Sequence, residues 1–138
     1  MAYNERGVTF IELIFVLVII GILASLALPN YRNIKEQALD KEAKVNLKLI
    51  QAAEKIYRME VGFYYHSIVC PDNAGINTNL RLSLPTGSSR SWSYQTQTAI
   101  ERADALRTRG EVISGRYWSL DITAEEPICT SATGDPCL

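Results

Sequence analysis

An α+β fold is predicted, in which one long N-terminal helix packs against a small antiparallel β-sheet. Three observations predict it: an apolar run near the N-terminus, an amphipathic stretch without glycine or proline after it, and short C-terminal segments in which apolar and polar residues alternate. The 138 residues are 47% hydrophobic and carry a net charge of -1. These values fit one small domain with an added segment.

The apolar run extends from Val8 to Leu28 and contains one charged residue, Glu12. About 20 apolar residues in a helix cross the hydrocarbon core of a bilayer, so this run is predicted to span a membrane. A secretory signal has its cleavage site after the apolar part, whereas here the small residue flanked by charge, Gly7, precedes it. Cleavage after Gly7 would leave the membrane helix in the mature protein.

Glu12 lies one turn inside the apolar run, and an acidic side chain at the centre of a membrane helix costs about 2.5 to 3.5 kcal/mol. Such a residue usually has a partner. Cleavage after Gly7 would create one, because the new amine of Val8 would lie one turn from Glu12, within the subunit or on a neighbouring subunit. In the alternative, Glu12 lies near enough to the membrane surface for its carboxylate to reach water.

The sequence ERG followed by VTFIELIFVLVIIGILASLALPNY, from Glu5 to about Tyr31, resembles the N-terminal signal of type IV pilins and of type II secretion pseudopilins. The resemblance implies a pilin-like fold. It also implies that a prepilin peptidase cuts after Gly7 and methylates the amine of Val8, and that Glu12 guides assembly. The family's first mature residue is usually Phe or Met, so Val8 departs from the pattern.

Two positions are expected to weaken the N-terminal helix. Pro29 lacks an N–H group and clashes with the preceding turn, which predicts a kink or local melting near residues 25–28 without ending the helix. Gly21 is a second flexible position. A helix that unwinds there could leave the membrane and repack in a filament, as the resemblance implies.

Residues 31–59 are predicted to form about eight further turns of helix with two adjacent apolar stripes. The first stripe consists of Leu39, Ala43, Leu47, Ile50, Ala53 and Tyr57, and the second stripe of Ile34, Ala38, Val45, Leu49, Ala52 and Ile56. A surface helix needs one stripe against its own core, so we assign one stripe to the head domain and the other to neighbouring subunits. In the alternative, the helix is embedded more deeply in its own domain.

The remaining sector of this helix is interpreted as a solvated face. It contains Asp40, Lys41, Lys44, Lys48, Lys55 and Arg58. All five lysines of the chain lie in the helical stretch, and the segment after it is mildly acidic. This distribution does not indicate a nucleic-acid surface.

The head is predicted to begin where Gly62 ends the helix in a left-handed conformation. Residues 66–81 are predicted to be rich in loops, and strands are predicted at 91–98 and 116–123. Residues 99–109 are ambiguous between strand and helix, with strand preferred. A sheet of three or four antiparallel strands would then bury a set of large side chains against the helix, namely Trp92, Tyr94, Trp118 and Leu120.

The predicted elements divide the chain into four parts. We expect residues 1–7 to form a leader peptide removed by prepilin peptidase, and residues 8–30 to form the transmembrane and assembly helix. Residues 31–60 would form the amphipathic half of the same helix, and residues 61–138 the globular, β-rich head.

Three cysteines, Cys70, Cys129 and Cys137, follow the apolar run, and export of this side would permit a disulfide. Cys129 and Cys137 flank a turn-forming stretch, and a bond between them would contribute about 2 to 3 kcal/mol. This pair resembles the C-terminal disulfide loop of many type IV pilins. Pairing of Cys70 with either of the other two, or no bridge, stays open.

No catalytic or metal site is predicted, and therefore no enzyme activity and no cofactor. His66, the single histidine, has no cysteine or carboxylate at metal-ligand spacing, and no phosphate-binding glycine loop occurs. The acidic residues have no calcium-loop spacing, but a calcium site built from loop carbonyls stays open.

The expected function is that of a structural subunit of a type IV pilus-like filament. The resemblance implies three partners: further copies of the chain, a prepilin peptidase and an inner-membrane assembly platform. It implies one pass through the inner (cytoplasmic) membrane with a cytoplasmic N-terminus, then incorporation into an extracellular pilus or a periplasmic pseudopilus. The alternatives are a pseudopilin of a type II secretion system and a membrane-anchored, exported domain that binds a ligand.

Overall fold

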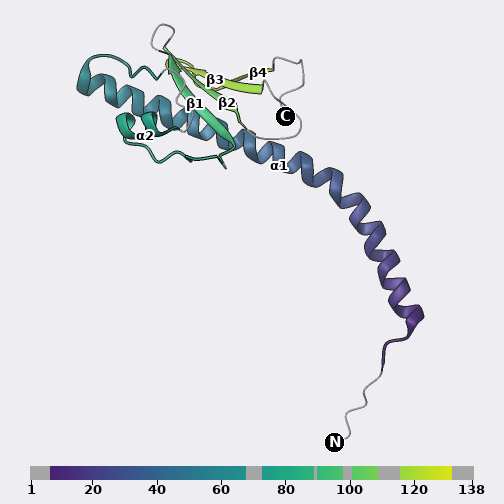
Figure 1. Ribbon diagram of the computed structural model, residues 1–138. Helices are drawn as coiled ribbons and strands as arrows, with labels where there is room; N and C mark the ends of the chain where they lie inside the picture. Colours follow the sequence, from purple (N-terminus) through teal and green to yellow (C-terminus); the bar gives the residue numbers. More distant parts are fainter. Residues whose placement is uncertain (1–6, 68–72, 89, 98–100, 109–115, 132–138) are drawn as a thin grey trace, which may run out of the picture. The chain divides into compact units, whose positions relative to one another are not determined.

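The computed structural model describes residues 7–67, 73–88, 90–97, 101–108 and 116–131, without the side chains of residues 27–30, 32, 116 and 131. The described chain contains a long helix, a short helix and four strands (Figure 1). The helices are α1 (Phe10–Val61) and α2 (Ala74–Leu80); the strands are β1 (Trp92–Gln97), β2 (Arg102–Arg107), β3 (Arg116–Asp121) and β4 (Ile128–Ser131). The α+β prediction is confirmed.

The chain divides into two compact units, Met1–Gln37 and Ala38–Leu138, and α1 contributes to both. In the first unit, α1 begins at Phe10, and its assignment as helix continues through Gly21 and Pro29. The predicted kink at these two positions stays a prediction. Within the described part of the chain, no helix has both the length and the apolar character needed to cross a membrane.

In the second unit, α1 ends at Val61 because Gly62 adopts a left-handed conformation with a φ of 96°. The Gly62 N–H donates a hydrogen bond to the carbonyl oxygen of Arg58 at 2.8 Å. The predicted helix end is therefore confirmed.

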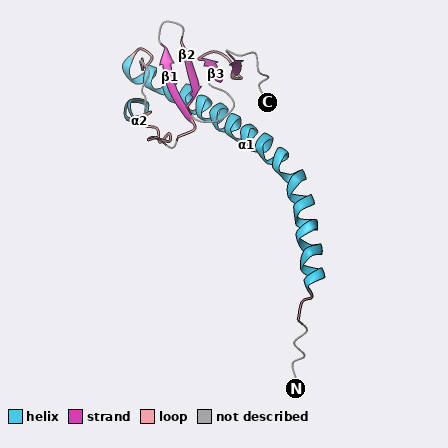
Figure 2. Ribbon diagram, turned by 45° about the vertical axis from the view of Figure 1, so that its right-hand side comes forward, coloured by secondary structure: helices cyan, strands magenta, loops and turns pink. Residues whose placement is uncertain are grey.

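The four strands form one antiparallel sheet in the order β1-β2-β3-β4 (Figure 2). Tyr94, Ala105, Trp118 and Cys129 lie opposite one another in successive strands and form a row across the sheet. The strand preference for residues 99–109 is confirmed by β2. The strand β4 was not predicted, since its sequence was read as the start of a turn-forming stretch.

The core lies between α1 and the sheet, and the first stripe of α1 supplies its helical side. Four of its residues, Ala43, Leu47, Ile50 and Ala53, are buried, and Leu39 and Tyr57 are partly buried. The four large side chains that were predicted to be buried, Trp92, Tyr94, Trp118 and Leu120, are buried in the sheet. Between them, Ala103 and Ala105 of β2 are small enough to let α1 approach the sheet.

Polar atoms of the core side chains bind α1 directly. The indole N–H of Trp92 donates to the carbonyl oxygen of Leu39 at 2.8 Å, and the amide of Asn46 donates to the hydroxyl of Tyr94 at 2.9 Å. A buried indole or phenol needs such a partner. These bonds determine where the sheet lies along the length of α1. The apolar stripe determines which side of α1 the sheet covers.

Asp40 corrects one prediction, because it was assigned to the solvated face and is only 2% exposed. Its carboxylate accepts the indole N–H of Trp118 at 3.2 Å, while the ammonium group of Lys44 lies 4.2 Å from the centre of the same ring. The face of α1 against the sheet is therefore wider than its apolar stripe, because β3 presents a hydrogen-bond donor to α1.

The helix α2 corrects the prediction of a loop-rich stretch at 66–81. Its apolar residues Ile76 and Leu80 lie one turn apart and are both buried. Before it, the buried side chain of Asn73 donates to the carbonyl oxygens of Pro85 and Trp92 and accepts the N–H of Tyr94. Tertiary contacts thus stabilise a helix of two turns whose local sequence favours turns.

We expect Leu47→Ala to lower the free energy of unfolding by about 2 to 5 kcal/mol, because it leaves a cavity between α1 and the sheet. Leu49→Ala is the matched control on the same helix, since Leu49 is 45% exposed. It should change stability by less than about 1 kcal/mol. Denaturant unfolding of the full chain in detergent micelles measures both; equal losses would contradict the assignment of the two stripes.

Candidate functional site

Two surfaces carry the features that the sequence singled out, one in each unit. The first is the start of α1, with Gly7, Val8 and Glu12. The second is the outward face of α1 in the head unit, which carries the second stripe. Among the described residues, no group of histidine, cysteine, aspartate and glutamate side chains could hold a metal ion.

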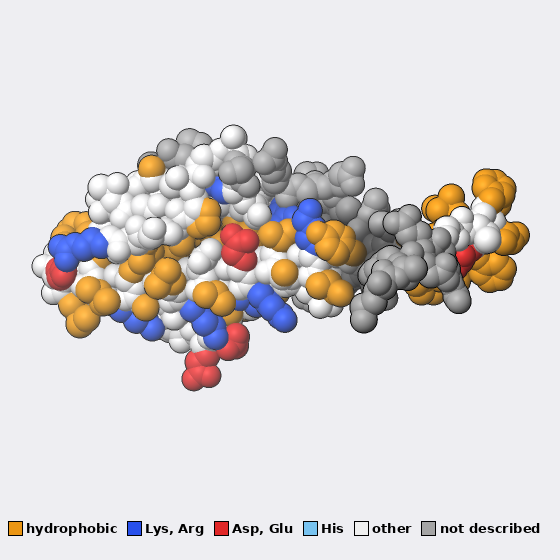
Figure 3. All heavy atoms as spheres, turned by 90° about the horizontal axis from the view of Figure 1, so that it is seen from below, with side chains coloured by type: hydrophobic (Ala, Val, Ile, Leu, Met, Phe, Trp, Pro, Cys, Tyr) orange, Lys and Arg blue, Asp and Glu red, His pale blue; other side chains and the backbone are white. Residues whose placement is uncertain are grey.

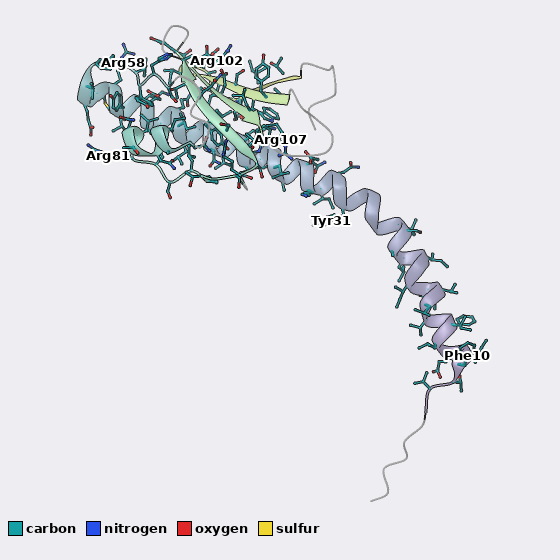
Figure 4. The ribbon with its side chains drawn as sticks, viewed as in Figure 1. Phe10, Tyr31, Arg58, Arg81, Arg102 and Arg107 are labelled. Carbon is teal, nitrogen blue, oxygen red and sulfur yellow. The ribbon has the colours of Figure 1, made fainter. Side chains whose placement is uncertain are left out.

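The start of α1 is apolar on all sides. Every side chain described from Val8 to Leu26 is exposed within this chain, and Phe10 is 78% exposed (Figure 4). A continuous apolar surface of this kind marks a protein or membrane contact. Gly7 precedes it in an exposed segment, where an added Cβ would meet nothing within 4 Å.

Glu12 forms a capping box with Thr9 at the start of α1, which the sequence analysis did not identify. The Thr9 N–H donates to a carboxylate oxygen of Glu12 at 3.5 Å, and the Glu12 N–H donates to the Thr9 hydroxyl at 3.4 Å. Both bonds are long. The sequence signal was the spacing of Thr and Glu three residues apart before an apolar run.

The capping box holds the Glu12 carboxylate beside the first free N–H groups of α1, where the helix dipole favours a negative charge. Val8 directly precedes Thr9 of the capping box, and in the uncleaved chain its nitrogen is part of the peptide bond with Gly7. An ion pair between Glu12 and a free Val8 amine therefore stays a prediction for the cleaved chain.

The second stripe is exposed along the outward face of α1 in the head unit. Val45, Leu49 and Ile56 are 66%, 45% and 54% exposed, and Ala38 and Ala52 are also exposed. The alternative that α1 is embedded more deeply in its own domain is wrong, since the head covers the first stripe and leaves the second one open. Figure 3 shows hydrophobic side chains on this unit with lysines and arginines among them.

A groove of about 270 Å³ adjoins the second stripe. It is lined from α1 by Leu49, Ala52, Ala53, Ile56, Tyr57 and Glu60, and from α2 and the residues after it by Asn79, Leu80, Arg81 and Leu82. Glu60 and Arg81 form an exposed ion pair of 3.5 Å at this groove, which contributes little to stability. The groove therefore offers an apolar floor with one charged pair.

Cys129 forms a disulfide bond, and its side chain packs against the core of the head. The other two cysteines, Cys70 and Cys137, lie outside the described residues. The prediction of a bridged cysteine in the head is supported, while its pairing with Cys137 stays a prediction.

Besides Asp40, two further buried carboxylates were missed by the sequence analysis. Asp104 accepts hydrogen bonds from the amides of Gln95 and Gln97 at 3.0 and 2.6 Å, and its second oxygen lies 2.8 Å from Nε of Arg102. Glu54 is 2% exposed and accepts the N–H of Tyr65 at 2.8 Å. In the sheet, Asp104 lies opposite Gln95, and the alternation of polar and apolar residues in residues 102–107 was the available signal. Nothing in the sequence indicated that Glu54 is buried.

Comparisons with known proteins concern the N-terminal half of the chain. Residues 3–28 match the family described as the prokaryotic N-terminal methylation motif. The chain is 44% identical over 61 residues to the type IV major pilin protein PilA of Myxococcus xanthus, which is 44% of this chain and 28% of that protein.

The same half is similar to type II secretion system core protein G. The identity is 40% over 64 residues to the Pseudomonas aeruginosa protein, covering 46% of this chain and 44% of that protein. The identity to the Escherichia coli protein is 37% over 61 residues, covering 44% of this chain and 42% of that protein. The chain thus spans less than half the length of the curated relatives it matches. No solved structure matches it significantly.

We expect the disulfide of Cys129 to involve Cys137. Digestion of the exported protein without reduction should release one linked peptide pair containing both residues, with a mass lower by two hydrogens than the sum of the free peptides. Mass spectrometry before and after reduction measures this. A linked pair containing Cys70 and Cys129, or free thiols at both Cys129 and Cys137, would contradict the pairing.

Proposed function

We propose, from the similarity of the N-terminal half of this chain to a type IV pilin and to type II secretion core protein G, that the protein is a structural subunit of a type IV pilus-like filament. The observation that carries the proposal is the exposure of α1. Apolar side chains are uncovered at its start, and a second stripe is uncovered where the helix passes the head.

Processing comes first in the proposed sequence of events. A prepilin peptidase cuts after Gly7 and methylates the new amine of Val8. The match of residues 3–28 to the methylation motif supports this step, as does the exposure of the segment before α1. The amine then lies one turn from Glu12, whose carboxylate the capping box already holds at the start of the helix.

Before assembly, the subunit is anchored in the inner membrane by the apolar run from Val8 to Leu28, with its N-terminus in the cytoplasm and its head exported. The single charge in this run supports the anchoring. The bridged Cys129 supports export of the head, because disulfides persist in oxidising compartments. The subunit would later be drawn from the membrane by an assembly platform.

In the filament, α1 would pack against the same helix of neighbouring copies. Burial of the second stripe and of the apolar N-terminal surface would supply the free energy, at roughly 25 cal/mol for each Å² of apolar surface removed from water. The lysines that flank the stripe would remain at the edges of this contact. Further copies of this chain are thus the partners that the exposed surface fits.

A pseudopilin of a type II secretion system is the second candidate. Similarity to core protein G of several bacteria supports it as directly as similarity to PilA supports the pilin. A Cys129 to Cys137 loop would favour the pilin. Both candidates are structural filament subunits, and neither requires catalytic residues or a cofactor.

We expect Glu12→Ala to be cleaved normally after Gly7 and to lower the yield of sheared fibres about tenfold or more. The cause is loss of the carboxylate that would pair with the Val8 amine. The chain is expressed with its peptidase and assembly ATPase, and mass spectrometry of pelleted fibres reports the amount and the N-methylated Val8. Glu125→Ala, at an exposed acid of the head, is the control and should leave the yield unchanged. Normal fibres from Glu12→Ala would remove the assembly role.

We expect Ile56→Lys to abolish fibres without unfolding the head, because it places a charge in the second stripe, where a neighbour would pack. Ile56 is 54% exposed, so stability of the monomer should change by less than about 1 kcal/mol. Fibre yield and denaturant unfolding are measured together. Thr130→Lys adds the same charge at an exposed position of β4 and should still give fibres. Wild-type yields from Ile56→Lys would mean that this stripe is not an assembly surface.

A further inference from the structure

A carboxyl group lies in the core where α1 meets the segment that follows it. Glu54 is on α1 and is only 2% exposed, which places it among the largest fully buried side chains. One oxygen accepts the N–H of Tyr65 at 2.8 Å. The other oxygen is buried and has no hydrogen-bond partner among the described residues.

The segment Tyr65–Ser67 lies between Glu54 and β1. On its other side, the hydroxyl of Thr96 donates to the carbonyl oxygen of Tyr65 at 2.9 Å. The same hydroxyl accepts the N–H of Ser67 at 3.1 Å, and Ser67 forms an isolated bridge with Thr96. The chain that leaves α1 is therefore attached on one side to the helix through Glu54 and on the other side to the sheet.

A small cavity of about 10 Å³ lies beside the Glu54 carboxyl. Its lining includes Thr96, Gln97, Glu101 and Arg102. A volume of about 10 to 15 Å³ holds one water molecule. The carboxyl group of Glu54 therefore adjoins a space large enough for one water molecule and too small for a full hydration shell.

The charged groups around this cavity do not neutralise Glu54. Arg58, one turn later on α1, donates to the hydroxyl of Tyr64 at 2.7 Å, and Arg102 of β2 pairs with Asp104 at 2.8 Å (Figure 4). Glu101, in the turn before β2, adds a second negative charge to the lining. The other titratable side chains next to the site in sequence, Lys55, His66 and Asp121, are exposed.

We propose that Glu54 is a proton-sensitive clamp, which holds the segment Tyr65–Ser67 to the end of α1 when its carboxyl is protonated and loosens when the carboxyl is ionised. A neutral carboxyl can remain in the dry core, whereas a carboxylate without a cation draws water into the cavity. The proposal concerns the head alone and does not depend on filament assembly.

The direction of the pH effect follows from the burial of the group. Burial raises the pKa of Glu54 from 4.5 to about 7, although the N–H of Tyr65 and the hydroxyl of Thr96 both act in the opposite direction. The folded protein therefore keeps this proton at pH values where the unfolded chain has lost it. The resulting stabilisation is complete below about pH 4.5, declines as the pH rises, and is lost at about pH 7.

The test uses the full chain in detergent micelles, with the carboxyl carbon of Glu54 followed by nuclear magnetic resonance. We expect a titration midpoint near 7. Over the same pH range, exchange of the Tyr65 amide proton, corrected for the intrinsic effect of pH, should rise about tenfold, which corresponds to a change of 1.4 kcal/mol in opening. A midpoint near 4.5 would overturn the proposal, and this result requires no variant to fold.

Two matched variants complete the test. Glu54→Gln keeps an acceptor for the Tyr65 N–H and cannot ionise, so the pH dependence of Tyr65 exchange should disappear. Glu60→Gln, at an exposed acid in the same last part of α1, should keep the wild-type pH dependence. Unchanged pH dependence in Glu54→Gln would assign the effect to another group and would overturn the clamp.

Discussion

Burial of one stripe of α1 against the sheet is the interaction on which the rest of the head depends. The two tryptophans and Tyr94 insert between helix and sheet, and each directs its polar atom at α1. This requirement explains why Asn46 and Asp40 lie inside the contact although they are polar. It also explains the alanines of β2, since larger side chains there would separate the two layers.

The same arrangement leaves α1 with apolar surface that the chain itself does not cover. A sheet of four short strands reaches one side of the helix in the head unit, and the second stripe lies on another side. In the N-terminal unit, the described apolar side chains have no covering element at all. A helix with this distribution is suited to burial by copies of itself, and the relatedness of its N-terminal half to pilins and to core protein G agrees with that use.

The carboxylates of this chain differ in how their charge is accommodated. Glu12 lies at a helix start, where backbone N–H groups favour an anion, and Asp104 is bound by two amides and an arginine. Among the described residues, Glu54 accepts the N–H of Tyr65 and forms no ion pair, so burial has the largest effect on its pKa. The donors that the fold supplies to a carboxyl group therefore decide whether its charge is stabilised or disfavoured.

The sequence by itself determined the elements whose signal is local. Periodicity identified α1 and its two stripes, Gly62 marked the helix end, alternation located β1 and β3, and the motif from Glu5 to Tyr31 indicated the family. Tertiary structure decided which stripe is buried, because two similar stripes are equivalent until a sheet covers one of them. It also decided the burial of Asp40 and Glu54 and the formation of α2, since these depend on donors and apolar partners far away in the chain. Local patterns carry no information about such partners, and this is the physical reason why they were missed.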